Sequence, residues 1–288
     1  MFAACNAVAK YLVLRLPVGE MLFARSAFAL LLLAPLLRRA DFAALRRTPD
    51  PGLHLLRCLC SAIEVACYYW AITLLPLAET GTIYLAGPIY VTALAAIFLH
   101  ESVGWRRWAA VLVGFAGVLV ALHPAGGPTV SAQALVALGG SLLYAISQVT
   151  TRQLRQTPTR VLVATQMAAL LVLSTFTAAP ILGRTGWAMP TALEAVMMAT
   201  IGVLAMLAYA CANNALQRAP ASVVAPFQYA SILAAIALGY LVFAEIPTVA
   251  TLAGAGIIVA AGGFILMREN RPRTARPCTP PARPTPAP

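Results

Sequence analysis

The sequence predicts an all-α integral membrane protein in which ten transmembrane helices form two inverted five-helix repeats. The first observation is composition: 61% of the 288 residues are hydrophobic and only 10% are charged, whereas a soluble domain carries about 25% charged residues. The second is a succession of nearly uncharged stretches, several of which reach the ~20 apolar residues that a bilayer-spanning helix needs. The third is a pair of sequence landmarks that recur at one constant offset.

The spans are expected to follow one another with short loops between them. The first span is short and contains Lys10. It has no basic segment at its start and no small-residue cleavage site, so it does not look like a secretory signal peptide. The apolar runs place the spans at residues 1–16, 20–37, 53–74, 77–99, 106–122, 132–151, 160–182, 191–214, 220–243 and 248–267.

The positions of the basic residues predict the orientation of the chain in the inner membrane. With these spans, 16 of the 20 Lys and Arg residues fall on one side, two (Arg15 and Arg184) fall on the other, and Lys10 and Arg25 lie inside spans. Cytoplasmic loops are enriched in Lys and Arg, so both termini are expected in the cytoplasm. The basic side holds Arg38, Arg39, Arg46, Arg47, Arg57, Arg106, Arg107, Arg152, Arg155, Arg160, Arg218, Arg268, Arg271, Arg273, Arg276 and Arg283.

The chain is expected to divide into a first repeat at residues 1–122, a second repeat at residues 132–267, and a tail at residues 268–288. From residue 270 onward the tail has seven prolines and four arginines. Such a composition does not form a helix, because proline removes a backbone donor and blocks the helical conformation. We expect a disordered, partly polyproline cytoplasmic extension.

Several classes of function are excluded by what the sequence lacks. The net charge of +11 comes from short clusters between apolar runs, without the basic face and interleaved aromatics of a nucleic-acid-binding protein. No His is spaced with the six Cys as a zinc site requires. The three His lie at loop edges, and no nucleophile with a base and no phosphate-binding Gly-Lys-Ser/Thr loop is present. We therefore expect no enzyme activity, no metal and no cofactor.

An internal repeat follows from two landmarks with the same separation. Pro76 and Pro220 each open an apolar span and are 144 residues apart. Glu101 and Glu245 each follow the end of that span, and they are also 144 residues apart. Because each unit contains five spans, an odd number, the two copies must cross the membrane in opposite directions. Inverted repeats of this kind are typical of transporters, with the substrate site between the units near the midplane.

These motifs resemble those of the drug/metabolite transporter superfamily, and within it the EamA family of ten-helix carriers. The resemblance covers residues 1 to about 268, and the short first span departs from the family pattern. It implies secondary transport by alternating access; similar carriers export amino acids, other metabolites or opine-type metallophores, and some take up riboflavin or S-adenosylmethionine. The motifs are FARS at 23–26, LLPLAE at 74–79, ESVGWRRW at 101–108, APASVVAP at 219–226 and GYLVFAEIP at 239–247.

Charged residues inside apolar spans are the first candidates for a substrate site, because a charge facing lipid is costly and such side chains normally face the bundle interior. They are Lys10, Arg25, Glu64 and Glu79, and Asn6 lies one turn before Lys10. For Arg25 and Glu79 an interfacial or helix-capping role is an equal alternative. Glu64 lies farthest from either interface, and an apolar environment disfavours its charged form. It is therefore the candidate for coupling transport to protons, the alternative being a neutral carboxyl bonded to a neighbouring helix.

Uncharged polar and aromatic residues complete the predicted cavity. Tyr84 and Gln228 are 144 residues apart and so occupy equivalent repeat positions, while Tyr144 and Gln148 lie one turn apart on the sixth span. Pro88 and Pro226 interrupt the fourth and ninth spans, where broken helices can expose carbonyls to a cavity. Others of this set, many of which could serve only packing, are Tyr68, Tyr69, Tyr90, Gln166, Tyr209, Asn213, Asn214 and Tyr229.

The function expected from these residues is movement of a small polar or zwitterionic metabolite. The mixed charges of Lys10, Arg25 and Glu64 favour a zwitterion, and export of an amino-acid-like compound or an opine-type metallophore is preferred. Uptake of riboflavin or S-adenosylmethionine is the alternative; a membrane-embedded enzyme or a structural subunit is less favoured. Small residues at helical spacing in the fifth span, including Gly114 and Gly117, suit close helix packing or a homodimer.

Overall fold

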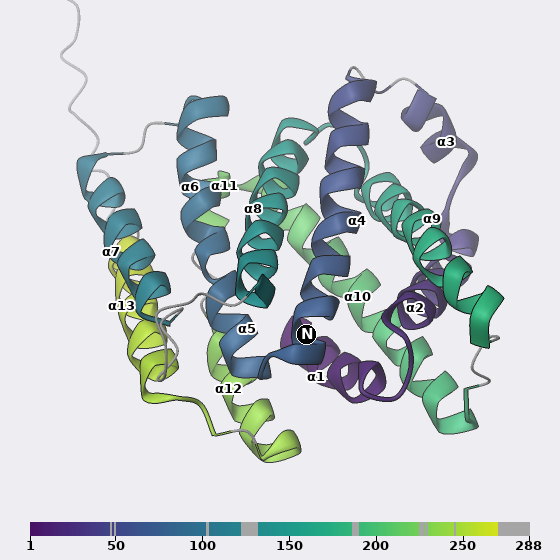
Figure 1. Ribbon diagram of the computed structural model, residues 1–288. Coiled ribbons are helices and arrows are strands. Elements are labelled where there is room, and N and C mark those ends of the chain that lie inside the picture. Colours follow the sequence, from purple (N-terminus) through teal and green to yellow (C-terminus); the bar gives the residue numbers. More distant parts are fainter. Residues whose placement is uncertain are drawn as a thin grey trace, which may run out of the picture.

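The computed structural model describes residues 1–46, 48, 50–101, 104–121, 132–185, 190–224, 228, 230–244 and 246–269 (Figure 1). Every regular element in those ranges is a helix. The elements are α1 (Phe2–Val13), α2 (Val18–Leu33), the 3₁₀ turn η1 (Ala34–Leu36), α3 (Arg39–Arg46), α4 (Pro51–Leu74), α5 (Leu77–Tyr84), α6 (Ala86–Phe98), α7 (Trp105–Ala121), α8 (Ala132–Gln153), α9 (Thr159–Thr185), α10 (Ala192–Arg218), α11 (Ala221–Val224), α12 (Ala230–Phe243) and α13 (Val249–Glu269).

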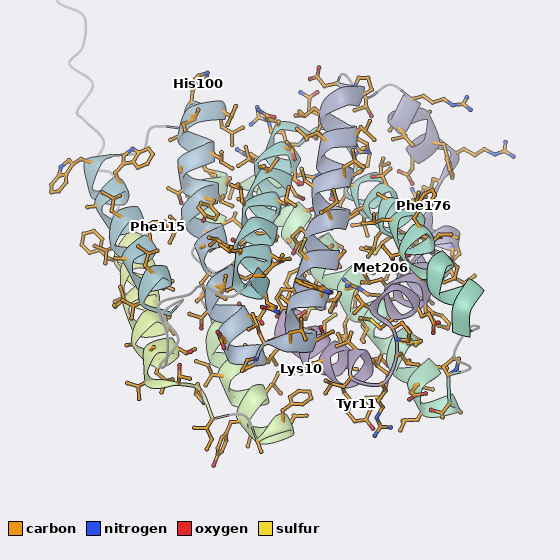
Figure 2. The ribbon with its side chains drawn as sticks, viewed as in Figure 1. Lys10, Tyr11, His100, Phe115, Phe176 and Met206 are labelled. Carbon is orange, nitrogen blue, oxygen red and sulfur yellow. The ribbon has the colours of Figure 1, made fainter. Side chains whose placement is uncertain are left out.

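The surface of the bundle is apolar, as a lipid environment requires. Large side chains such as Leu241 (76% exposed) and Phe176 (73% exposed) point outward, and Figure 2 shows Phe115 and Phe176 at the outer surface. By length and composition, six helices of the described chain can cross a membrane: 18–36, 51–74, 79–98, 132–153, 159–178 and 192–218. The all-helical class is confirmed, whereas the number of ten spans and the inverted repeat stay predictions.

Two local features differ from an uninterrupted series of spans. The fourth expected span consists of α5 and α6, which meet at Leu85. Pro88 has no N–H to bond the carbonyl of Tyr84, so the helical hydrogen-bond ladder is interrupted one turn earlier. Pro226, its expected counterpart, lies outside the described residues. The loop after the second span contains the short helix α3, whose start is fixed by the Arg38 backbone N–H donating to Asp41 (2.8 Å).

The C-terminal tail was expected to begin at residue 268. Helix α13 extends to Glu269, and residues 270–288 lie outside the described part of the chain. The tail's disorder therefore stays a prediction.

The ends of the fourth and ninth expected spans share an unusual backbone conformation. His100 and Ala244 have φ values of 51° and 52°, and they are the non-glycine residues with positive φ in the described ranges. They are 144 residues apart, the same offset as the sequence landmarks. His100 lies two residues after the end of α6 and Ala244 directly follows α12, where a left-handed residue commonly ends the helical hydrogen-bond pattern.

Helices that are distant in sequence pair closely across the bundle. Helix α4 packs along α8, α7 along α13, and α2 against α9 and α10. On α7, a Cβ added to Gly117 would lie 3.0 Å from the Gly254 carbonyl oxygen of α13. The small residues of α7 thus bring two helices of one chain together. The homodimer stays a prediction.

Gly202 makes the closest contact between α10 and α2. A Cβ at this position would lie 2.9 Å from the Arg25 carbonyl oxygen and 3.2 Å from the Ala29 nitrogen. Since these are backbone atoms of a packed helix, we expect Gly202→Ala to destabilise the protein by about 1–3 kcal/mol. Gly139 in α8 has no atom within 4 Å of its added Cβ. Gly139→Ala is therefore the control, and it should leave stability unchanged or raise it slightly because alanine favours helix.

Thermal unfolding of both glycine variants in detergent measures the difference. Equal midpoints for Gly202→Ala and Gly139→Ala would contradict the close α2–α10 contact.

Candidate functional site

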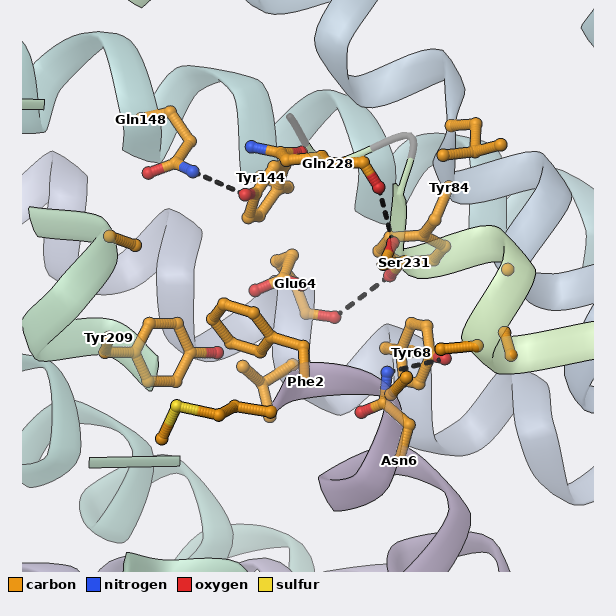
Figure 3. Close-up of a pocket in the computed structure, with 18 of the residues that line it drawn as sticks. Phe2, Asn6, Glu64, Tyr68, Tyr84, Tyr144, Gln148, Tyr209, Gln228 and Ser231 are labelled. Carbon is orange, nitrogen blue, oxygen red and sulfur yellow. Dashed lines mark hydrogen bonds between the residues drawn. The ribbon is translucent and has the colours of Figure 1, made fainter. Parts of the chain in front are cut away.

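A cavity of about 470 Å³ lies at the centre of the bundle. This volume is within the range of small-molecule sites, about 300–1,000 Å³. Helices α1, α2, α4, α5, α8, α10 and α12 all contribute to its wall. Its polar and aromatic lining residues, many of them labelled in Figure 3, are Phe2, Asn6, Arg25, Glu64, Tyr68, Tyr69, Tyr84, Tyr144, Gln148, Tyr209, Gln228 and Ser231.

Helical spacing explains why these side chains share one wall. Glu64 and Tyr68 are four residues apart on α4, and Tyr144 and Gln148 are four apart on α8. Residues at this spacing lie on the same face of a helix. Because α4 and α8 pack along each other, their polar faces border one common space.

Glu64 is the acidic group of the cavity. Its side chain is 8% exposed, and Figure 3 shows it among Phe2, Tyr144 and Ser231. The Tyr84 hydroxyl donates to the backbone carbonyl of Glu64 (3.2 Å), which holds α5 against α4. The Glu64 carboxyl group thus projects into the cavity from a turn of α4 that is held by a hydrogen bond from α5.

Arg25 is the basic group of the same cavity, and its side chain is 2% exposed. The guanidinium carbon lies 5.1 Å from the centre of the Tyr69 ring, and the group contacts the Tyr209 hydroxyl. Its Nε and Nη1 atoms are buried without a hydrogen-bond partner among the described residues. Buried polar groups in proteins are nearly always hydrogen-bonded, so these donors are suited to an anionic ligand or to water.

Aromatic rings form much of the remaining wall. The Tyr68 ring meets the Tyr84 ring edge to face with centroids 4.7 Å apart, and the Phe2 and Tyr209 rings meet similarly at 5.3 Å. Asn6 Nδ2 donates to the Tyr68 hydroxyl (2.9 Å), and Gln148 donates to the Tyr144 hydroxyl. These bonds fix the orientation of the rings and leave apolar faces toward the cavity.

Eight of the eleven residues predicted for the site line this cavity: Asn6, Arg25, Glu64, Tyr68, Tyr84, Tyr144, Gln148 and Gln228. The other three do not. Asn213 instead lines a second cavity of about 10 Å³, which borders Glu64 and Gln148 as well. That the eight residues bind a substrate stays a prediction.

Lys10 and Glu79 serve helix ends rather than the cavity wall. Lys10 Nζ donates to the Leu75 carbonyl just after α4 ends (3.3 Å), where a cation complements the negative end of the helix dipole. It also lies 5.4 Å from the centre of the Phe243 ring. Glu79 lies in the first turn of α5, where a carboxylate complements the positive helix end. The helix-capping alternative considered for Glu79 thus agrees with its position.

Sequence reasoning missed Phe2, Ser231 and Arg57. Phe2 carried no signal, because an aromatic residue at the start of an apolar helix is ordinary. Ser231 lies three residues after Gln228, a spacing that could have suggested it. Arg57 was counted among the loop arginines, but it lies within α4 and is 0% exposed.

Glu101 organises the end of the bundle rather than the cavity. Its carboxylate accepts hydrogen bonds from the backbone N–H groups of Ala221 (3.1 Å) and Ser222 (3.3 Å) and from the Ser222 hydroxyl (2.5 Å). It therefore joins the end of α6 to the start of α11. Glu245, its counterpart by sequence, lies outside the described residues.

Metal-binding groups do not gather in the part of the chain that the structure describes. No cluster of three or more His, Cys, Asp or Glu side chains suited to a metal ion occurs there. The lining of the cavity, a single arginine and a single glutamate among tyrosines and amides, suits an organic ligand.

The match to a family model decides the family. The model of the EamA-like transporter family matches residues 1–122 and 132–267. The chain belongs to the EamA-like transporter family. It is therefore a multi-pass membrane protein, and EamA-like proteins are transporters rather than enzymes.

Curated EamA-like relatives differ in substrate and direction. The chain is 28% identical to a riboflavin transporter of Vibrio cholerae, with 94% of this chain and 90% of the relative covered. It is 26% identical to an S-adenosylmethionine uptake transporter of Rickettsia felis, with 93% and 90% covered. It is 30% identical to the pseudopaline exporter of Pseudomonas aeruginosa, with 90% of each chain covered.

A solved crystal structure has a similar fold. It superimposes with a TM-score of 0.67 over 93% of this EamA-like chain and 96% of the other, at 18% sequence identity. At that identity the likeness concerns the fold alone.

Proposed function

We propose that this EamA-like protein is a secondary active transporter that exports a small, amino-acid-like zwitterion across the inner membrane by alternating access. The observation that carries the proposal is the presence of Arg25, with buried and unpartnered nitrogens, and of Glu64 in one central cavity. The proposal includes ten spans, two inverted repeats at residues 1–122 and 132–267, and both termini in the cytoplasm. The common offset of His100 and Ala244 supports the repeat.

A zwitterion is favoured because it compensates both charges at once. A buried charge without a partner is costly, by several kcal/mol per ion even after relaxation. A carboxylate can accept from the free N–H groups of Arg25, while an ammonium group can donate to Glu64. A neutral solute would leave the unpartnered N–H groups of Arg25 without an anionic acceptor. The Tyr68 and Tyr84 rings would contact the apolar remainder of the solute.

The number of basic groups limits the charge of the ligand. Arg25 is the only Lys or Arg among the described residues that line the cavity, and Lys10 is engaged at the end of α4. One cation suits a solute with one dominant carboxylate better than a polycarboxylate. Within the proposal, an amino-acid-like compound is therefore preferred over an opine-type metallophore.

Uptake of riboflavin or S-adenosylmethionine is the alternative. The tyrosine-rich wall favours it, because flat ring systems stack on aromatic side chains. S-adenosylmethionine also carries an amino-acid zwitterion, so its binding would use Arg25 and Glu64 in the same roles. The riboflavin and S-adenosylmethionine transporters similar to this protein match nearly the whole chain.

We propose that Glu64 couples transport to protons. The Glu64 carboxyl group can bind a proton or, when ionised, pair with an ammonium group. Binding of the solute and binding of a proton then compete at one side chain. Export would follow when a proton that enters from outside displaces the solute.

Comparison of cells with and without this gene tests the proposal. Untargeted metabolomics of cell extract and spent medium identifies the solute. A compound that accumulates in the deletion strain and is missing from its medium establishes export. A compound that stays in the medium of the deletion strain establishes uptake instead. If reconstituted protein moves neither that compound nor amino acids across liposomes, the carrier function is wrong.

A further inference from the structure

Arg57 is a buried cation that the proposed transport site does not use. It lies in the second turn of α4 and is 0% exposed, the largest of the fully buried side chains. A buried charge is normally paired with an opposite charge. In the described part of the chain, the hydrogen-bond partners of Arg57 are all neutral.

The oxygen acceptors of Arg57 come from the other family-matched segment. Nε donates to the Thr151 hydroxyl in the last turn of α8 (2.8 Å). Nη1 donates to the Leu162 carbonyl (3.1 Å), and Nη2 donates to Gln166 Oε1 (3.1 Å), both in α9. One side chain from residues 1–122 thus holds two helices of residues 132–267. One turn before Arg57, the His54 ring nitrogen Nε2 lies 3.0 Å from the Thr165 hydroxyl of α9.

Arg57 lies directly beyond the cavity, toward the end of the bundle where α4 begins. Gln166, which accepts from Arg57, also lines the second cavity of about 10 Å³. That second cavity is bordered by Glu64, Tyr144, Gln148 and Tyr209, which also line the central cavity. Arg57 therefore bonds to a residue in the wall of the second cavity, which shares lining residues with the central cavity.

A second contact closes the same end independently. Helix α4 begins and α6 ends at the upper end of Figure 1, and Figure 2 labels His100 there. Glu101 follows His100 and binds the start of α11, again across the two matched segments. Both contacts join charged groups to neutral partners. Water can replace such partners when helices separate, so closed and open arrangements differ little in hydrogen bonding.

We propose that Arg57 is the gate residue that closes the central cavity toward the end of the bundle where α4 begins. The gate opens when Arg57 releases Thr151, Leu162 and Gln166 and water solvates its guanidinium group. Glu101 holds α11 in the closed arrangement. The proposal rests on the carrier function proposed above, because only a carrier needs an end that closes reversibly. If the basic side of the chain is cytoplasmic, this is the cytoplasmic gate.

Accessibility of a cavity cysteine tests the gate without any substrate. Ser147 lines the second cavity, and Ser147→Cys places a thiol behind the gate at little change in volume. Its reaction with a membrane-impermeant methanethiosulfonate is measured in right-side-out and inside-out vesicles, with the chain lacking this substitution as background. We expect Arg57→Gln to raise the labelling rate roughly tenfold from the side where α4 begins, within the usual range of coupling between states.

Arg152→Gln is the matched control. Arg152 lies at the same end, but it donates to the Leu216 and Gln217 carbonyls (2.8 and 2.9 Å) within the same matched segment. This variant should label at the parent rate. Thr151→Val removes the acceptor of Nε without removing a charge, and it should raise labelling about threefold, as loss of one hydrogen bond predicts. Size-exclusion chromatography shows whether Arg57→Gln folds. If it does not, Thr151→Val alone tests the gate.

The outcomes separate the gate from the carrier function. Folded Arg57→Gln and Thr151→Val proteins that label like the parent from both sides would overturn the gate, even if the parent transports a solute. Faster labelling confined to the predicted side would support the gate, even if no solute is moved and the carrier function fails. Equal acceleration in Arg152→Gln would show general loosening and overturn the specific role of Arg57.

Discussion

Replacing Arg25 with glutamine is expected to lower the apparent affinity for the transported solute by about 30-fold or more. Removing one partner of a buried, hydrogen-bonded charge pair costs about 2–5 kcal/mol. In this protein the loss would fall on the solute carboxylate, because Nε and Nη1 of Arg25 have no hydrogen-bond partner in the described chain. Initial rates in proteoliposomes, measured over a range of solute concentrations, give the change in KM.

Arg15→Gln is the control for this experiment. Arg15 is an exposed residue beside the Tyr11 ring, at 4.5 Å from its centre, and it does not line the cavity. Its variant should transport like the parent. Arg25→Lys should keep part of the affinity, since it retains the charge but has fewer donors. A KM for Arg25→Gln within twofold of the parent would remove Arg25 from the binding site.

Glu64→Gln is expected to abolish the response of transport to an imposed pH gradient and to lower the transport rate about tenfold or more. Glutamine keeps the shape of the side chain, but it does not titrate and carries no negative charge to pair with an ammonium group. Transport is measured in proteoliposomes with and without the gradient. A deaminated analogue of the solute lacks the ammonium group. The Glu64→Gln variant should transport this analogue at nearly the parent rate, whereas Arg25→Gln should transport it much more slowly.

Glu79→Gln supplies the matched control for Glu64. Glu79 is a half-buried carboxylate in the first turn of α5 and does not line the cavity. Its variant should keep the response to the pH gradient. A Glu64→Gln protein that still responds like the parent would show that the coupled proton binds elsewhere.

The long helices of the bundle could be predicted from sequence because they coincide with long apolar runs. The interruption of the fourth span could also be predicted, because the missing backbone N–H of Pro88 affects only the hydrogen bonds of the turn before it. Helix α3 was not predicted, because it depends on one side-chain bond from Asp41 to the Arg38 backbone. The pairing of α7 with α13 could not be derived from the apolar pattern, because in lipid nearly every face of a helix is apolar.

The cavity was partly predictable for a physical reason. Charged and amide groups inside apolar spans are costly unless they face the interior, and this rule identified Arg25, Glu64 and Gln148. Lys10 is buried as the rule requires, but its long side chain reaches the Leu75 carbonyl at a helix end instead of the cavity wall. The rule was not applied to Arg57, because its position near the start of α4 resembles that of a loop arginine. Where a long side chain ends depends on its neighbours, which the sequence alone does not reveal.

The pairing of distant helices affects how the protein is made. Helices α2, α4 and α7 each pack along a helix that is synthesised later, namely α9 and α10, α8, and α13. During translation the first 122 residues therefore reach the membrane with faces that have no partner. We infer that this segment produced alone would be a target for membrane proteases. Co-production of residues 123–288 as a separate chain should rescue it, since the missing partners would then be supplied in trans.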